Sequence, residues 1–257
     1  MPPTRFWDHA RDVSGGVGFS GAVFDVDGVL VDSPHERAWR DALRQLMDTS
    51  WSDLRDRARY SPDGFTSELY REHMSGKPTF SGARAALRHF EIPEDEARIE
   101  EYGRKKQQVM DRLVEAEGVV AYPDALRFVR AVRSAGIPMA AASSSKNAAN
   151  LLARVRLEPD LTLLDAFDVD VSGRDFPEGG KPHPEIFLTG ARELRVDANR
   201  CLVVEDSVAG VRAGIAAGMW VIGLARAGDA DVLREAEADL VVTTLDEVDL
   251  AAVSRAG

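Results

Sequence analysis

Short apolar runs alternate with longer amphipathic stretches along most of this chain, and the alternation stops between residues 36 and 118. Each run is typical of a buried strand, and each is followed by a helix-like stretch or a loop. The expected strands are 21–25, 137–142, 167–171, 201–205, 219–224 and 239–243. This repeated order predicts an α/β fold with a Rossmann-like parallel sheet that helices cover on both faces.

The interrupting stretch contains no convincing strand, but it contains several segments with helical periodicity. These segments are 36–47, 51–59, 63–74, 81–90 and 94–117. We therefore expect an all-helical insertion, with hinges near Pro34 and Gly118. The predicted division is a polar N-terminal leader at 1–20, a core domain at 21–34 and 119–257, and a helical cap domain at 35–118.

Charge and hydropathy limit the kinds of molecule that this protein can be expected to bind. The formal net charge is -11 at pH 7, so the chain has no overall attraction to nucleic acid or to an anionic membrane. No apolar run is long enough for a membrane-spanning helix, and Cys201, the single cysteine, is expected to be a buried strand residue without a disulfide. We expect a cytoplasmic monomer or small homo-oligomer whose partner is a small anionic molecule.

Acidic residues stand where two of the expected strands end. Asp25 and Asp27 follow the first apolar run, and residues i and i+2 of an extended chain point the same way. Glu205 and Asp206 end another run, and the carboxyl ends of parallel strands meet at one crevice. Four converging acids need a cation, and Mg²⁺ prefers oxygen ligands. The simpler alternatives are an acidic turn for the first pair and a helix cap for Asp206.

Two further polar motifs accompany expected strand and helix ends. Ser143 and Ser145 follow the 137–142 run, where hydroxyls and the N–H groups of a helix start can form a phosphate cradle. Lys181 lies in a loop rich in Gly and Pro, directly before a helix expected at 184–194. Its charge can orient a nucleophile and offset phosphoryl charge. Ser145 as an ordinary N-cap and Lys181 as a solvated lysine are the alternatives.

In this order and spacing, the four motifs resemble those of the haloacid dehalogenase superfamily, over nearly the whole chain. The resemblance implies that Asp25 is a nucleophile that forms an aspartyl-phosphate and that Asp27 is the general acid/base. It also implies that Ser143 and Lys181 contact the phosphoryl group. The implied ligands of Mg²⁺ are Asp25, the main-chain carbonyl of Asp27, Glu205 and Asp206. We expect Asp27 to be protonated because carboxylates surround it, and its presence argues against a dehalogenase.

The helical insertion resembles the cap of the β-phosphoglucomutase-like subgroup. His35 is similar to the cap histidine that helps activate a sugar hydroxyl, and Lys106 is similar to the lysine that supports it. The residues that resemble a site for a second phosphate are Ser145, Lys146 and Asn147. One departure concerns the cap arginine that grips the distal phosphate, because the comparable loop here carries Lys77, with Arg84 nearby.

The motifs together predict Mg²⁺-dependent hydrolysis of a small phosphorylated metabolite, with a sugar phosphate as the expected substrate. If a sugar hydroxyl takes the place of water, the enzyme is a β-phosphoglucomutase that interconverts β-glucose 1-phosphate and glucose 6-phosphate. A third alternative is a catalytically silent, metal-binding interaction protein. The intact set of acids, serine and lysine argues against that alternative.

Overall fold

A computed structural model describes residues 18–249 of the protein. Its centre is a six-stranded sheet in the order β10-β9-β8-β1-β4-β7, and every neighbouring pair is parallel. The strands are β1 (Gly21–Phe24), β4 (Met139–Ala141), β7 (Val169–Asp170), β8 (Cys201–Glu205), β9 (Trp220–Leu224) and β10 (Leu240–Val242). All six strands that the apolar runs predict are present, and the Rossmann-like α/β fold is confirmed.

Helices cover both faces of this sheet, because successive side chains of a strand point to opposite faces. Val23 of β1 and Val203 of β8 belong to a buried cluster with Phe187 of α8 (Glu185–Leu194), whereas Phe24 of β1 packs edge to face against Phe128 of α6 (Pro123–Ser134). The core helices are α6 (Pro123–Ser134), α7 (Ala148–Arg154), α8 (Glu185–Leu194), α9 (Val208–Ala216) and α10 (Ala230–Glu235). Burial on both faces explains why the strands are continuous apolar runs.

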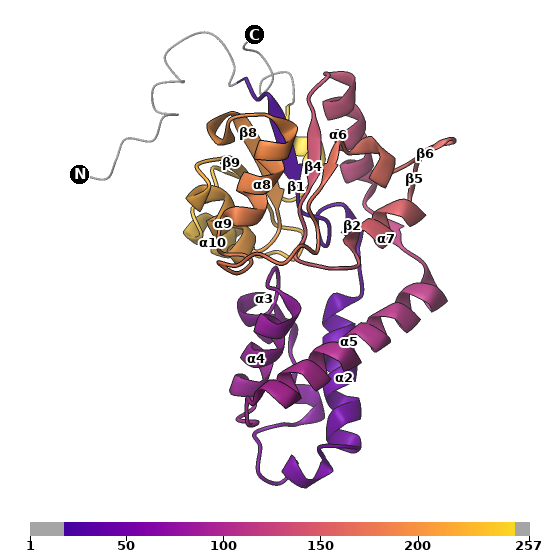
Figure 1. The fold of residues 1–257 in the computed structure, drawn as a ribbon, viewed down its shortest axis with the longest axis vertical. Coiled ribbons are helices and arrows are strands. Elements are labelled where there is room, and N and C mark those ends of the chain that lie inside the picture. Colours follow the sequence, from indigo (N-terminus) through magenta and orange to yellow (C-terminus); the bar gives the residue numbers. More distant parts are fainter. Residues whose placement is uncertain (1–17, 250–257) are drawn as a thin grey trace, which may run out of the picture.

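The remaining helices form a cap beyond the carboxyl edge of the sheet, as Figure 1 shows. They are α2 (His35–Asp48), α3 (Ser67–His73), α4 (Thr79–His89) and α5 (Glu96–Glu117), with the 3₁₀ turns η1 (Ser52–Leu54) and η2 (Pro62–Gly64). Trp39 of α2 meets Tyr102 of α5 edge to face, and the Tyr102 hydroxyl donates to the Trp39 carbonyl at 3.0 Å. These contacts join the two long helices of the cap.

The helix expected at 51–59 is wrong, because this segment forms only η1 and a series of turns. Trp51 and Leu54 are its buried apolar side chains. Two anchors do not make the apolar stripe through which packing stabilises a helix of that length.

Two short strands that the apolar pattern did not predict lie where the chain enters and leaves the cap. β2 (Val31–Asp32) pairs antiparallel with β3 (Val120–Ala121), and the Tyr122 N–H donates to the Leu30 carbonyl at 3.1 Å. A second antiparallel pair, β5 (Arg156–Glu158) with β6 (Leu161–Thr162), also lies outside the main sheet. Strands this short show no alternation that a sequence pattern could reveal. The β2–β3 pair holds the two crossings of the cap side by side.

No helix within residues 18–249 is long and apolar enough to cross a lipid bilayer. Cys201 is a free, buried cysteine in β8, as the apolar run around it predicted. The expected leader at 1–20 lies almost entirely outside the described residues.

Candidate active site

Acids that are far apart in the sequence meet at the carboxyl edge of the sheet. β1 and β8 are neighbours, with Phe24 paired to Val204, so the residues that follow each strand are adjacent. Carboxylate oxygens of Asp25, Glu205 and Asp206 all lie within 4.8 Å of one another. The structure therefore brings together three of the acids that the sequence analysis singled out.

The Lys181 side chain is fully buried between two of these acids. Its ammonium donates to Asp25 Oδ1 at 2.5 Å and to Glu205 Oε1, and the other oxygen of Glu205 accepts from the N–H and hydroxyl of Ser207. Burial acts to lower the pKa of Lys181, but the charges of Asp25 and Glu205 raise it. Burial raises the pKa of Asp25, although Lys181 opposes that shift. The lysine therefore remains charged and orients the Asp25 carboxylate.

Asp206 differs from the other two acids, because no described residue donates a hydrogen bond to its carboxylate. Burial and the charges of Glu205 and Asp25 raise the pKa of Asp206 well above its ordinary value. The three carboxylates and the one ammonium leave a formal surplus of two negative charges. A donor set of oxygens with that surplus fits Mg²⁺, a divalent ion that prefers oxygen ligands.

Asp27 lies in a different environment, surrounded by donors. Its Oδ1 accepts from the Ser33 hydroxyl at 2.5 Å and lies 3.1 Å from His35 Nε2, while Oδ2 accepts from the Ser143 hydroxyl at 3.2 Å. Burial acts to raise the pKa of Asp27, but His35 and Ser33 lower it below its ordinary value. The expectation that Asp27 is protonated is therefore wrong for this arrangement, because donors, and not carboxylates, surround its oxygens.

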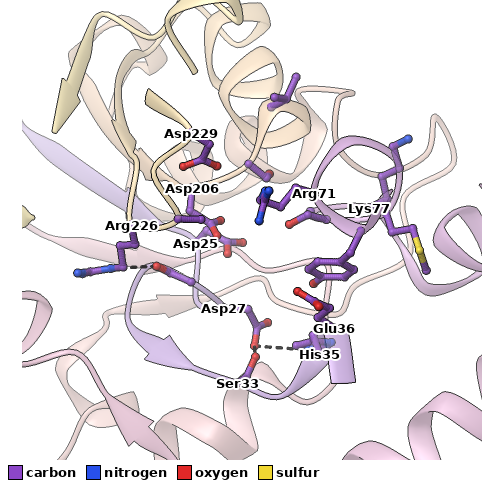
Figure 2. A pocket seen from close by; sticks show the side chains of 18 of the residues that line it. Asp25, Asp27, Ser33, His35, Glu36, Arg71, Lys77, Asp206, Arg226 and Asp229 are labelled. Carbon is purple, nitrogen blue, oxygen red and sulfur yellow. Dashed lines mark hydrogen bonds and ion pairs between the residues drawn. The ribbon is translucent and has the colours of Figure 1, made fainter. Parts of the chain in front are cut away.

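A cavity of about 560 Å³ lies between the core and the cap, and Figure 2 shows many of the side chains that line it. From the core, the predicted site residues that line it are Asp25, Asp27, Ser143, Ser145 and Asp206. From the cap, they are His35, Lys77 and Lys106. Most of the residues predicted to bind or react therefore face one space.

A polar row runs from Asp27 into the cap. Lys106 Nζ lies 2.7 Å from His35 Nδ1, and His35 Nε2 lies beside Asp27. Lys106 is buried and lies 5.5 Å from the centre of the Trp39 ring. Burial lowers the pKa of Lys106 to about 8. The sequence resemblance predicted this partnership of His35 with Lys106, and the two side chains are in contact.

Five candidate residues are not among the described residues that line the cavity. Lys181 and Glu205 are fully buried behind Asp25, so Lys181 does not reach the space where it was expected to contact a phosphoryl group. The other three are Lys146, Asn147 and Arg84. Lys146 Nζ is exposed and lies 3.1 Å from Asp175, and Arg84 donates to Glu96 at 2.7 Å. Because these cations are paired at the surface, the arrangement does not support the predicted second-phosphate contacts of Lys146 and Asn147. Of the two cap cations that the sequence offered for a distal phosphate, Lys77 lines the cavity and Arg84 does not.

One cap loop, residues 75–78, touches three core loops. The Ser144 hydroxyl donates to the Gly76 carbonyl at 2.9 Å. Gly76 has φ +73°, and a Cβ there would lie 2.2 Å from Ser207 Oγ. A Cβ on Gly180 would lie 2.3 Å from Pro78 Cγ. Ser144, Gly180 and Ser207 are neighbours of site residues, so this loop closes directly over the acids.

Sequence reasoning missed several residues of the cavity, notably Arg71 and Arg226. Arg71 points into the cavity toward Asp206 and Asp25 in Figure 2, and it forms no ion pair with another described residue. Nothing in the charged helix around it distinguishes Arg71. Arg226 follows β9 at the sheet edge where the other motifs lie, and that position was a usable signal.

A parallel α/β sheet with clustered acids at its carboxyl edge and a helical cap above them defines an enzyme with a capped active site. The chain matches the haloacid dehalogenase-like hydrolases over residues 19–218, and it belongs to that family. It is an enzyme of a group whose members include phosphatases and beta-phosphoglucomutases.

The similar proteins include both a phosphatase and beta-phosphoglucomutases. Hexitol phosphatase A of Escherichia coli (strain K12) is 32% identical over 230 residues, which cover 89% of this chain and 92% of that protein. A beta-phosphoglucomutase of Mycobacterium bovis is 32% identical over 245 residues, which cover 88% and 90%. A solved archaeal beta-phosphoglucomutase from the hyperthermophilic Pyrococcus sp. Strain ST 04 has a TM-score of 0.66 at 27% identity, covering 90% of this chain and 95% of that one.

Proposed function

We propose that this enzyme hydrolyses a small phosphorylated metabolite of the sugar phosphate class through a phosphoryl group carried on Asp25. One observation supports this most directly. Buried Lys181 holds the Asp25 carboxylate at the edge of a cavity into which Asp27 also projects, with Ser143 and His35 in contact with Asp27. The relationship to a hexitol phosphatase supports a phosphorylated polyol or sugar as the substrate.

The chemistry needs one nucleophile and one group that moves a proton. The Asp25 carboxylate attacks phosphorus, and the bond from phosphorus to the leaving oxygen breaks. Asp27 gives that oxygen a proton and then, once ionised, takes a proton from the water that releases phosphate from Asp25. Because its neighbours favour the ionised form of Asp27, the first proton must be delivered to it. His35, with Nε2 3.1 Å away, is the titratable side chain in contact with it.

Asp25, Glu205 and Asp206 would hold Mg²⁺, with the main-chain carbonyl of Asp27 as the further predicted ligand. When bound, Mg²⁺ offsets the negative charge of the phosphoryl group and of the clustered carboxylates. Lys181 orients Asp25 and adds a positive charge beside it. The Ser143 hydroxyl, which donates to Asp27 in this structure, would turn to donate to a phosphoryl oxygen. Closure of the cap excludes bulk water from the transfer.

A second candidate is a phosphomutase, with β-phosphoglucomutase as the specific case. The row from Asp27 through His35 to Lys106 favours it, because a base carried by the cap is suited to activating a sugar hydroxyl. The residues expected to hold a second phosphate argue against a mutase. Lys77 is a point charge where a fork would hold a second phosphate better, and Lys146 pairs with Asp175. Hydrolysis is therefore the first conclusion.

Hydrolysis of a generic aryl phosphate, with and without Mg²⁺, tests the proposed chemistry in the intact protein and in Asp25→Asn. We expect Mg²⁺-dependent phosphate release by the wild type and a loss of at least about a thousandfold in Asp25→Asn. Equal rates in the two proteins would eliminate Asp25 as the nucleophile.

The two candidate reactions differ in their products from β-glucose 1-phosphate with a trace of glucose 1,6-bisphosphate. Glucose 6-phosphate without stoichiometric inorganic phosphate identifies a mutase. Steady release of phosphate without glucose 6-phosphate removes that alternative. A panel of phosphorylated sugars, assayed for released phosphate, then identifies the preferred substrate.

A further inference from the structure

Arg226 lies just beyond β9 and is bound to the turn that carries Asp27. Its Nε donates to the Gly28 carbonyl at 3.1 Å, and its Nη2 donates to the Val29 carbonyl at 3.3 Å. Neither carbonyl accepts a hydrogen bond from another described backbone N–H. The guanidinium therefore satisfies two main-chain acceptors that the turn leaves open.

The other side of the guanidinium is bound to the segment that leaves the cap. It lies 3.0 Å from the Asp124 carboxylate at the start of α6 and 3.9 Å from the centre of the Tyr122 ring. Asp124 also accepts from the Leu245 N–H at 2.8 Å and from the Thr244 hydroxyl at 2.9 Å. Arg226 thus joins the Asp27 turn to the exit from the cap and to the end of the described chain.

The turn itself has little room to move. It is closed by hydrogen bonds from the Gly28 N–H to the Val31 carbonyl and from the Leu30 N–H to the Val26 carbonyl, both 2.9 Å. Gly28 has φ +84°, and a Cβ there would lie 1.9 Å from Asp206 Oδ2. A shift of this turn would therefore move Asp27 and press on an acid of the site.

The guanidinium of Arg226 is directed away from the acids of the candidate active site. Figure 2 shows its guanidinium pointing away from Asp25 and Asp206, although its side chain borders the cavity. It is therefore placed to act through the main chain and not on the substrate. A planar guanidinium can donate along several directions and stack on a ring at once, which a lysine cannot do.

We propose that Arg226 is a positioning residue, which fixes the Gly28 and Val29 carbonyls to Tyr122 and Asp124 and so sets the place of Asp27 beside Asp25. The kinetic part of this inference rests on the proposed phosphoryl transfer. The structural part, which concerns the rigidity of the turn, does not depend on it.

The kinetic test compares Arg226→Met and Arg226→Lys with the wild type, on an aryl phosphate with Mg²⁺. For Arg226→Met we expect kcat to fall by about thirtyfold to a hundredfold, with KM within about threefold, because a small misplacement of a reacting group has that effect. Arg226→Lys retains the charge but not the planar guanidinium with its several donors. It should therefore recover less than about a third of the kcat that Arg226→Met loses. Arg234→Met, which removes an exposed ion pair with Asp231, is the matched control.

Two kinetic outcomes would overturn the inference. One is a kcat for Arg226→Met within about twofold of the wild type, since a positioning role predicts a larger loss. The other is full recovery in Arg226→Lys, which would make the charge alone sufficient. Thermal unfolding of each variant shows whether a lost rate merely follows a lost folded fraction, and Asp124→Asn, which preserves side-chain shape, is the second variant if Arg226→Met does not fold.

Hydrogen exchange separates this inference from the proposed function. In Arg226→Met, the amides of Gly28, Leu30 and Val31 should exchange at least about tenfold faster, while amides of β8 keep their wild-type rates. This readout needs no activity, so it stands even if the wild type hydrolyses no phosphate ester. Unchanged exchange in the turn would overturn the inference whatever the kinetics show.

Discussion

The core and the cap face the same cavity, but the Lys181–Glu205 pair of the core and the cap cations Lys77 and Arg71 are held in opposite ways. In the core, Lys181 and Glu205 have no exposed side-chain surface, and the Lys181 ammonium is bound to both Glu205 and Asp25. In the cap, Lys77 is only half-buried and Arg71 is exposed, and neither has an ion pair with a described residue.

This difference separates two tasks. A buried and fully partnered set of charges is already oriented for one reaction, and its geometry does not depend on the ligand. Unpaired cations on a cap can adapt to the anion that enters. We therefore expect changes in the core to abolish chemistry and changes in the cap to alter substrate binding.

The largest effect is expected for Lys181→Met in the core. Loss of the cation leaves Asp25 and Glu205 without their shared partner, so kcat should fall by at least about a thousandfold. Unfolding should also become easier, by about 3 to 5 kcal/mol, because one partner of a buried ion pair is removed. Aryl phosphate kinetics and thermal unfolding measure the two effects. Retention of more than about a tenth of the activity would contradict the role given to the core.

A smaller loss is expected for Gly76→Ala in the cap loop. The new Cβ would meet Ser207 Oγ, and the positive φ of Gly76 disfavours any side chain. The cap should then dock poorly, and kcat/KM should fall by about tenfold to a hundredfold. Gly136→Ala is the matched control, because φ is +70° there and nothing lies within 4 Å of the added Cβ. Equal effects of the two substitutions would show that backbone strain, and not docking, is responsible.

Lys77→Met tests the expectation that the cap selects the substrate. Lys77 lines the cavity, so KM for a preferred sugar phosphate should rise by about tenfold while kcat changes by less than about twofold. Arg84→Met, which breaks a surface pair with Glu96, should leave both constants unchanged. A fall in kcat without a change in KM would show that Lys77 acts in catalysis, and it would contradict the assignment of substrate binding to the cap.

The smallest effect concerns stability. The pKa of Lys106 is about 8 in the folded protein and 10.5 ordinarily, so keeping this lysine charged in the fold costs about 3 kcal/mol. The cost is fully present below pH 8 and disappears as the pH rises through 10.5, because the unfolded chain binds more protons there.

Lys106→Met removes that cost but also removes the contacts with His35 and Trp39. We expect a net gain of roughly 1 kcal/mol near pH 7, seen as a rise of a few degrees in Tm. The advantage over the wild type should shrink above pH 8. Lys105→Met, on the same helix, is the control. A Tm that falls at pH 7 would show that the cap contacts outweigh the cost of burying the charge.

Much of the core could be predicted from the sequence, because its signals are local. An apolar run between polar turns already specifies a strand that is buried on both faces. Polar residues that follow such runs must lie at one edge of a parallel sheet, which is why Asp25, Glu205 and Asp206 could be grouped in advance. The cap helices were predictable in the same way, except at 51–59, where too few apolar side chains support a helix.

The tertiary structure alone decided which partners these residues have. The lowered pKa of Asp27 depends on Ser33 and His35, and the pairing of Lys146 with Asp175 removes that lysine from the cavity. Arg226 holds a turn almost two hundred residues before it in the chain. A sequence pattern reports the conformation that a segment prefers, whereas burial and charge neighbours depend on which distant segments the fold places side by side.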